Sequence, residues 1–301
     1  MNITELRYLV AIVKWGSVSA AAKHLYVAQP NISKALKNLE EEYHLRIFDR
    51  TPTGMQPTEP GRRFITQAVR VLAEVDRLGQ GSDAADQAVL RAALPRADYT
   101  AAAVQDFLSL SAQASRIQIH IRECCASTAL ERVLCHGYQL AVLRYALQDQ
   151  EHFAAYCAQQ ELHMEPLLDF CYGLLTNRDC PLACHEVQEL AELDQYAEVL
   201  DEELQLPSGA SSFWHSNPQR QIRLSDRISQ LEALRRMSNA YMWASPMPQT
   251  ILDRFHLALR PCPAQRLPMR DVLVWPKGQP LSPEAQRFGQ MLRQQAAHAV
   301  R

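Results

Sequence analysis

The sequence contains no long apolar run. No window approaches the roughly 18 uncharged apolar residues that a membrane-spanning helix needs. Glu5 and Arg7 interrupt the first apolar stretch, so the basic-then-apolar pattern of a secretory signal is missing. We therefore expect a protein that has no membrane partner and stays in the cytoplasm.

Metal-ligand spacing is also lacking. The 8 cysteines include no C-x-x-C pair, a spacing typical of structural zinc sites. The histidines also form no set with the spacing of metal ligands; they include His24, His44, His163 and His215. We expect mostly free thiols, no metal and no cofactor. No phosphate-binding loop or nucleophile–base pair indicates catalysis, so we predict no catalytic residue and no enzyme.

Lysine is scarce outside the N-terminal region. Four of the five lysines lie in the first 40 residues: Lys14, Lys23, Lys34 and Lys37. Residues 1–63 hold nine Lys and Arg against six Asp and Glu, a balance of +3. The remainder holds 22 against 27, a balance of −5. Basic charge is therefore concentrated at the N-terminus, where a polyanion could bind.

The first forty residues show three helical patterns in succession. The first has an apolar face that ends at Gly16 and consists of Leu6, Leu9, Val10 and Val13. Ser17 or Ser19 can cap a short second helix, and a third begins near Gln29 with Pro30 in its first turn. The third helix turns polar side chains outward, as a helix that reads the DNA major groove does. The pattern fits a solvated helix of a bundle equally well.

A hairpin follows these helices. Leu45, Ile47 and Phe48 predict a short strand, residues 51–54 a turn, and residues 55–57 a returning strand. Such a hairpin is the wing of a winged helix-turn-helix. Its guanidinium groups, Arg46 and Arg50, could contact the DNA backbone.

The N-terminal region resembles the DNA-binding domain of LysR-type transcriptional regulators. The resemblance lies in five runs that follow the family's order: Ala21–Leu25, Val27–Lys34, Leu39–Glu40, Leu45–Arg50 and Thr58–Gly61. Two positions depart from the family. Ala28 replaces a capping Ser or Thr, a loss of roughly 1 kcal/mol, and Pro60 replaces Ala where a first helical turn tolerates it.

The resemblance implies that double-stranded DNA is a partner of this chain. The positions that match the family's DNA contacts are Gln29, Pro30, Ser33 and Lys34. We add Asn31, Lys37 and Arg50 as candidates, although Arg50 could equally fix the wing in place. We expect residues 1–58 to form the DNA-binding domain.

A long linker helix is expected over residues 59–81. Its a/d seam consists of Phe64, Ala68, Val71, Val75 and Leu78. This stripe could pack on the protein's own first helix. The resemblance implies instead the same helix of a second copy, giving a dimer or a dimer of dimers on a near-palindromic site.

Residues 86–301 alternate strands with helices, which predicts an α/β domain with a parallel sheet. The resemblance implies a fold like that of periplasmic binding proteins. We expect subdomain I at about 86–161 and 266–301, and subdomain II at about 162–265. A small-molecule effector would bind in the cleft between them.

Ligands of open α/β sheets bind at the carboxyl ends of the strands, beside helix N-termini. The candidate effector residues there are Thr100, Cys125, Ser127, Thr128, Asp201 and Pro246. Ser127 could be only a helix cap. The acidic run that begins at Asp201 favours a cationic or amphoteric effector, unless the register is shifted.

Three functions remain open from the sequence. The resemblance favours an effector-responsive LysR-type regulator. A thiol-based redox sensor is an alternative, because Cys124 and Cys125 border the predicted cleft, although small buried thiols are the favoured explanation of this pair. An enzyme fused to a DNA-binding head is the third.

Overall fold

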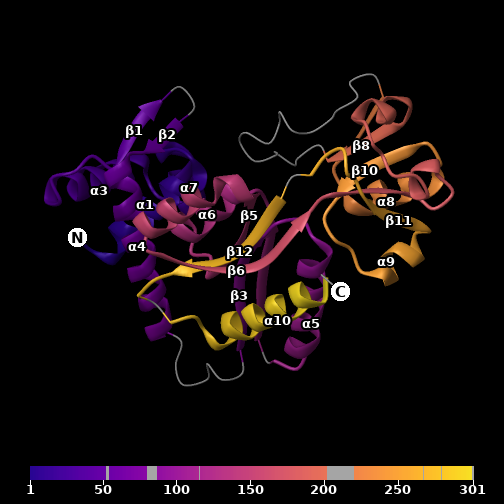
Figure 1. Cartoon of the computed structure of the whole chain (residues 1–301). Helices are drawn as coiled ribbons and strands as arrows, with labels where there is room; N and C mark the ends of the chain where they lie inside the picture. Colours follow the sequence, from indigo (N-terminus) through magenta and orange to yellow (C-terminus); the bar gives the residue numbers. More distant parts are fainter. Residues whose placement is uncertain are drawn as a thin grey trace.

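The computed structural model describes residues 1–51, 54–79, 87–114, 116–201, 220–266, 268–278 and 280–299. Figure 1 shows a helical head that carries a hairpin, a central unit built on one sheet, and a smaller unit on the side away from the head. This is the expected fold class. None of the helices described combines the length and apolar character needed to span a bilayer.

The head contains three short helices around one core. They are α1 (Ile3–Trp15), α2 (Val18–Leu25) and α3 (Gln29–Glu42). Gly16 ends α1 with φ 72°, a left-handed conformation that suits glycine, and the Ser17 side chain caps α2. The core between them is fully buried and includes Leu6, Leu9, Ile12, Ala21, Ile32 and Leu39. The predicted helix-turn-helix is confirmed.

The predicted wing is also confirmed. Strands β1 (Phe48–Thr51) and β2 (Gly54–Pro57) pair antiparallel, with Phe48 opposite Pro57. The Met55 N–H donates to the Gly16 carbonyl at 2.9 Å, which ties the wing to the turn after α1.

Helix α4 (Glu59–Gly79) leaves the head, and the last two residues of the predicted linker lie outside the described residues. The Thr58 hydroxyl accepts from the Gly61 N–H at 2.9 Å and so caps the helix. A side chain on Gly61 would collide with the root of the wing, because an added Cβ would lie 2.0 Å from the Ile47 carbonyl oxygen.

The predicted α4 seam is divided between two environments. Ala68 is buried in the chain's own core, and Phe64 packs its ring 4.8 Å from Tyr43. Val71 is 42% exposed and faces solvent. The side chain of Leu78 lies outside the described residues. Part of this stripe therefore packs on the head, and part remains available to a second copy.

The central unit is a five-stranded sheet in the order β4-β3-β5-β12-β6. Its strands are β3 (Gln87–Leu94), β4 (Arg116–Glu123), β5 (Leu140–Ala146), β6 (Leu162–Cys171) and β12 (Pro268–Pro276). The predicted parallel sheet is correct for β3, β4 and β5, but β12 runs antiparallel to both of its neighbours.

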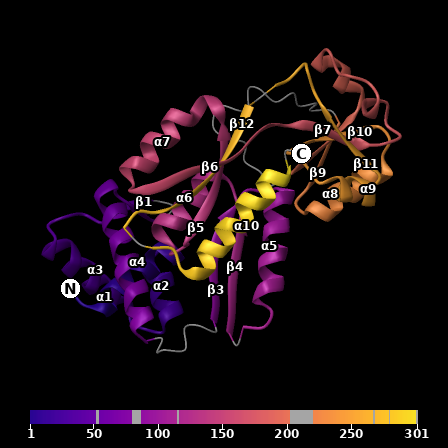
Figure 2. The same ribbon diagram turned by 60° about the horizontal axis from the view of Figure 1, so that its bottom comes forward.

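Helices cover both faces of this sheet. One face carries α5 (Asp98–Ser111) and α10 (Pro283–Ala299), which lie side by side in Figure 2. Their contact is apolar and includes the rings of Phe107 and Phe288, with centroids 5.4 Å apart. The other face carries α6 (Ala126–Cys135) and α7 (Gln150–Gln159), and its core is continuous with that of the head.

The smaller unit has a second five-stranded sheet in the order β11-β7-β10-β8-β9. The strands are β7 (Gly173–Asn177), β8 (Ala197–Asp201), β9 (Gln221–Leu224), β10 (Ala240–Ala244) and β11 (Leu257–Pro261). Helices α8 (Arg227–Arg236) and α9 (Gln249–Arg254) accompany it. A 3-10 helix, Leu190–Gln195, precedes β8.

Two crossovers join the sheets. Tyr172 separates β6 from β7, and residues 262–267 separate β11 from β12. The expected start of subdomain II at 162 differs from the structure, because residues 162–171 form β6 and pair with β12 in the first sheet. The physical reason is that β6 pairs with β12 along its whole length, so the chain leaves the first sheet only after Cys171.

Candidate functional site

Helix α3 presents its polar side to solvent. Gln29, Pro30, Asn31, Lys34 and Lys37 are exposed, and Ser33 is partly exposed. Apolar Ile32, Ala35 and Leu39 point into the core. The structure thus brings six of the seven predicted DNA-contacting residues onto one helix. The seventh, Arg50, lies in β1, but its side chain is outside the described residues.

The two ends of α3 differ in how they are held. At its start, Ala28 offers no side-chain hydrogen bond, so the first turn lacks a side-chain cap, as expected from the sequence. Near its end, the Glu40 carboxylate accepts from the Ile47 N–H at 2.7 Å and fixes the wing to the helix. This role of Glu40 was not predicted, although Glu40 belongs to the run that carries the resemblance.

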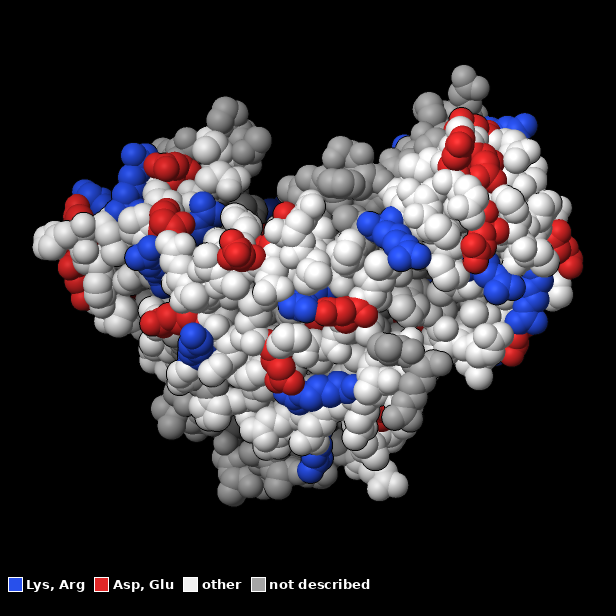
Figure 3. Space-filling view, in the orientation of Figure 1, with Lys and Arg blue, Asp and Glu red and all other residues white. Residues whose placement is uncertain are grey.

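Charge on the head is mixed. Lys37 pairs with Glu41 at 3.4 Å, and Arg46 pairs with Asp49 at 3.1 Å. Figure 3 shows basic and acidic side chains interspersed over this part of the surface. Arg46 also donates to the Phe48 carbonyl at 3.3 Å, so part of its hydrogen-bonding capacity is used within the wing.

A cavity of about 890 Å³ lies where the two sheets meet, and it extends to the head. The first subdomain contributes Pro95, Arg96, Cys124, Cys125, Ser127, Arg144 and Tyr172 to its wall. The second contributes Glu198, Val199, Leu200, Arg223, Arg227, Gln230, Met242, Trp243 and Ser245. Several of them, including Pro95, Cys124 and Ser245, directly follow strands, which is where a ligand was expected.

Three of the six predicted effector residues lie at or beside this cavity, and the other three do not line it as described. Cys125 and Ser127 line it, and Thr128 lies beside them. The structure does not bring Thr100 to the cavity wall: it is 1% exposed, and its hydroxyl donates to the Ala97 carbonyl at 2.7 Å. Pro246 is likewise absent from the lining, where its neighbour Ser245 stands. The Asp201 side chain lies outside the described residues.

The start of α6 places a thiol beside two hydroxyls. Cys125 Sγ lies 3.2 Å from Ser127 Oγ and 3.4 Å from Thr128 Oγ1. Burial raises the pKa of Cys125, but the hydrogen bonds from Ser127 and Thr128 outweigh it, so the net pKa is lowered. Burial raises the pKa of the adjacent Cys124 to about 11.

The interpretation of Ser127 as a helix cap is wrong. The residue at the cap position is Cys125, and no side-chain cap bond forms there. Ser127 lies within the first turn and is exposed on the cavity. Its hydroxyl is therefore accessible from the cavity rather than bonded to the backbone as a cap.

Arg144 and its partners were not predicted. The Arg144 guanidinium donates to both oxygens of Asp271, and Tyr99 donates its hydroxyl to the same carboxylate at 2.8 Å. A further Arg144 N–H donates to the Tyr172 hydroxyl at 3.3 Å. Although burial lowers the pKa of Arg144, attraction to Asp271 outweighs it and raises that pKa well above its ordinary value. The available signal was a charged residue inside each of two apolar strands.

Among the described residues, one ion pair joins the two subdomains. Arg227, the first residue of α8, reaches Asp98, the first residue of α5, at 3.3 Å. Burial raises the pKa of Asp98, and Arg227 only partly offsets this effect. Because α5 belongs to the first subdomain and α8 to the second, the pair spans the cleft that a ligand would enter.

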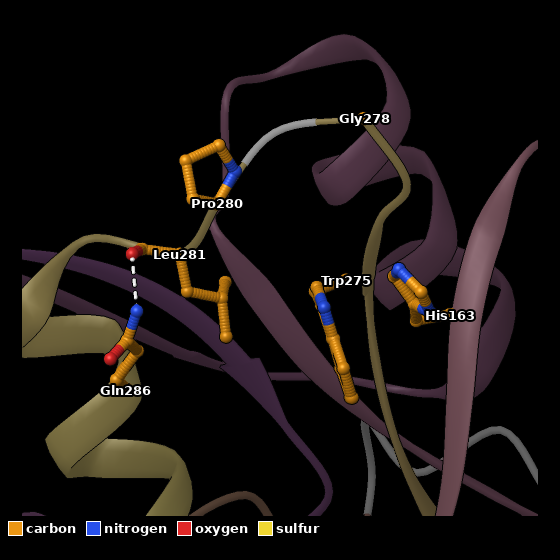
Figure 4. A pocket seen from close by; sticks show the side chains of 6 residues that line it. All are labelled: His163, Trp275, Gly278, Pro280, Leu281 and Gln286. Carbon is orange, nitrogen blue, oxygen red and sulfur yellow. Dashed lines mark hydrogen bonds between the residues drawn. The ribbon is translucent and has the colours of Figure 1, made fainter.

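A second, smaller hollow lies at the opposite end of the first sheet. His163 and Trp275 stack there with ring centroids 5.0 Å apart, and the Gln286 amide donates to the Leu281 carbonyl at 3.0 Å (Figure 4). None of the predicted site residues lies among the side chains that line it. Elsewhere in the described chain, no group of three His, Cys, Asp or Glu could hold a metal ion.

Two domain families match the chain. Residues 3–62 match the bacterial regulatory helix-turn-helix protein domain of the lysR family, and residues 107–297 match the LysR substrate binding domain. The nitrogen assimilation regulatory protein Nac of Klebsiella aerogenes is 26% identical over 200 residues, which is 65% of this chain and 62% of Nac. The alignment thus spans less than two thirds of that relative.

Solved structures share the architecture. ArgP from Mycobacterium tuberculosis has a TM-score of 0.65 at 18% identity, covering 97% of this chain and 96% of ArgP. LysG from Corynebacterium glutamicum, solved with its effector Arg bound, has a TM-score of 0.64 at 16% identity, covering 99% of each chain. Identities this low show the fold alone. Because the two domain matches together cover most of the sequence, the chain belongs to the lysR family of bacterial transcription regulators.

Proposed function

We propose that this protein is a DNA-binding transcription regulator that responds to a small-molecule effector. One observation carries the proposal: a helix with exposed Gln29 and Lys34 and a cavity lined by Ser127 and Arg227 occur in the same chain. The helix suits base reading in the major groove. The cavity lies between two subdomains, where ligand binding can change their relative position.

Helix α6 provides a physical connection between the two functions. Its first turn carries Cys125 and Ser127 into the cavity. Farther along, Val133 and Leu134 are buried in the core shared with the head, where Val69 and Leu72 of α4 pack. A ligand that shifts the start of α6 would therefore move the surface on which the linker helix rests.

We propose that a dimer, or a dimer of dimers, binds a near-palindromic promoter site. The exposed Val71 on α4 supports a contact with a second copy, and two-fold symmetry pairs two reading helices. A protein acting on a bacterial chromosome works in the cytoplasm, so we propose that location. The match to a regulatory family also favours regulation over catalysis.

Sequencing of captured DNA tests the proposal. Genomic fragments bound by the full chain should be enriched for an inverted repeat. The enrichment should disappear with Lys34→Ala and persist with Lys277→Ala, a matched change at an exposed lysine far from the head in the sequence. Equal capture of all fragments, or equal loss with both variants, would contradict sequence-specific binding by α3.

Thiol-based sensing is a second candidate. The observation that favours it is the lowered pKa of Cys125 beside Cys124 at the cavity wall. A sensor of this kind should change its DNA affinity after treatment with hydrogen peroxide, and the change should vanish with Cys125→Ser. An effector-responsive regulator should show no such change.

A further inference from the structure

The part of the cavity between the subdomains has a cationic wall. Four arginines line it: Arg96, Arg144, Arg223 and Arg227. With Arg62, five arginines line the cavity as a whole, against three acidic side chains among the described residues: Glu131, Asp149 and the buried Glu198 of β8. Because opposite charges attract strongly where water is partly excluded, this wall favours an anionic ligand.

Arg144 and Arg227 differ in how well they are satisfied. Arg144 grips the fully buried Asp271 with two hydrogen bonds of 2.8 Å, an arrangement that leaves its charge neutralised. Arg227 has only one oxygen acceptor among the described residues, the Asp98 carboxylate at 3.3 Å. Its other contacts are thioether sulfurs at 3.7 and 3.9 Å, which are weak acceptors.

Asp98 is a poor partner for Arg227. A single contact of 3.3 Å is longer than the 2.7–2.9 Å typical of charge-assisted hydrogen bonds and lacks the two-point geometry of a guanidinium–carboxylate pair. Burial of Asp98 also penalises its charged form more than Arg227 compensates, as the raised pKa of Asp98 indicates. A ligand that approaches Arg227 through the cavity can make better hydrogen bonds than Asp98 does.

We propose that the cleft binds a small organic carboxylate through the Arg227 guanidinium, and that Asp98 is an internal competitor which the ligand displaces. This inference rests on the proposed effector function and assigns the effector's chemical class. The cavity wall also includes Met242, Trp243 and Leu200, so the ligand can carry an apolar part beside its carboxylate. Displacement of Asp98 removes the one ion pair described between α5 and α8, and so changes how the subdomains are held together.

Calorimetry with defined probes tests this assignment on the full chain without DNA. The probes are phenylacetate and hexanoate, each compared with its neutral amide. We expect an acid to bind and its amide not to bind. Arg227→Gln should weaken binding of the acid about tenfold or more, because a hydrogen bond to a charged group is lost. Arg235→Gln on the exposed side of the same helix should bind as the wild type does.

Asp98→Asn gives a readout in the opposite direction. Removal of the competing charge should tighten binding of the acid several-fold, a result that misfolding would not produce. Absence of acid binding to both the wild type and Asp98→Asn would overturn the proposal, as would weaker binding by Asp98→Asn. A loss of DNA binding would instead count against the regulatory function, since calorimetry of the protein alone does not depend on it.

Discussion

Arg144 and Asp271 form a two-point ion pair inside the first subdomain, with both N–H···O distances 2.8 Å. Asp271 is fully buried and also accepts from the Tyr99 hydroxyl. The pair links β5 to β12, and Tyr99 adds α5. Since β12 is the antiparallel strand that returns from the second subdomain, this contact fixes it in the first sheet.

Loss of the Asp271 charge should be costly. Asp271→Ala leaves Arg144 buried without its partner, and we expect the free energy of unfolding to fall by about 3–5 kcal/mol. A urea titration followed by tryptophan fluorescence measures this change. Asp169→Ala is the matched control, because the Arg270–Asp169 pair is half-exposed and should contribute about 1 kcal/mol or less. Equal losses would mean that burial does not govern the effect.

The reading helix makes separable contributions to affinity and specificity. Gln29→Ala should relax the preference at one base pair by about 1–3 kcal/mol, because a base-edge contact is lost. Lys34→Ala should weaken all sequences alike and lower the salt slope by about one unit. Titrations of specific and scrambled duplexes distinguish the two. If neither variant differs from the wild type, α3 does not read DNA.

The linker helix should support a second copy of the chain. In a single copy, the apolar Val71 side chain is exposed. A second copy that covers it would bury the charge introduced by Val71→Asp, and burial of that charge is unfavourable. We expect monomers at micromolar concentration in sedimentation, together with weaker DNA binding. Gln67→Asp, also exposed on α4, serves as the control. A dimer that survives Val71→Asp would place the interface elsewhere.

The hydroxyls at the start of α6 can be tested apart from stability. Because neither Ser127 nor Thr128 caps the helix, changing both to Ala should leave the melting temperature within a few degrees of the wild type. The response to effector should be lost if they bind it. Thermal denaturation and DNA-binding assays on one preparation report both quantities. A lower melting temperature with a normal response would assign these residues a structural role.

The two adjacent thiols should differ in reactivity. The lowered pKa of Cys125 provides more thiolate near pH 8 than Cys124, whose pKa burial raises to about 11. Iodoacetamide should therefore label Cys125 first, and Cys124 should gain reactivity only as the pH rises toward 11. Peptide mass spectrometry after brief labelling at pH 7 to 9 measures the order. Preferential labelling of Cys124 would contradict it.

Local patterns in the sequence predict the head well and the cavity less well. The helices of the head have clear apolar periodicity and a glycine or serine at their ends, so their positions follow from neighbouring residues. Arg144 and Asp271 are 127 positions apart, and only the fold shows that they meet. Helix α7 has a single buried residue, Cys157, so its sequence has no apolar periodicity from which a helix could be predicted. Thr100 was placed in the cleft because it was expected beside a helix N-terminus, but α5 begins at Asp98 and Thr100 is buried.

The contact between Gly61 and the Ile47 carbonyl has a mechanical consequence. With no side chain to separate them, the first turn of α4 and the root of the wing cannot hinge apart without losing their packing. The wing is also bonded to the turn after α1 and to Glu40 of α3. We therefore expect the head to follow a rotation of α4 as a rigid lever, so that a change of a few degrees at the linker would alter the spacing between the two heads of a dimer.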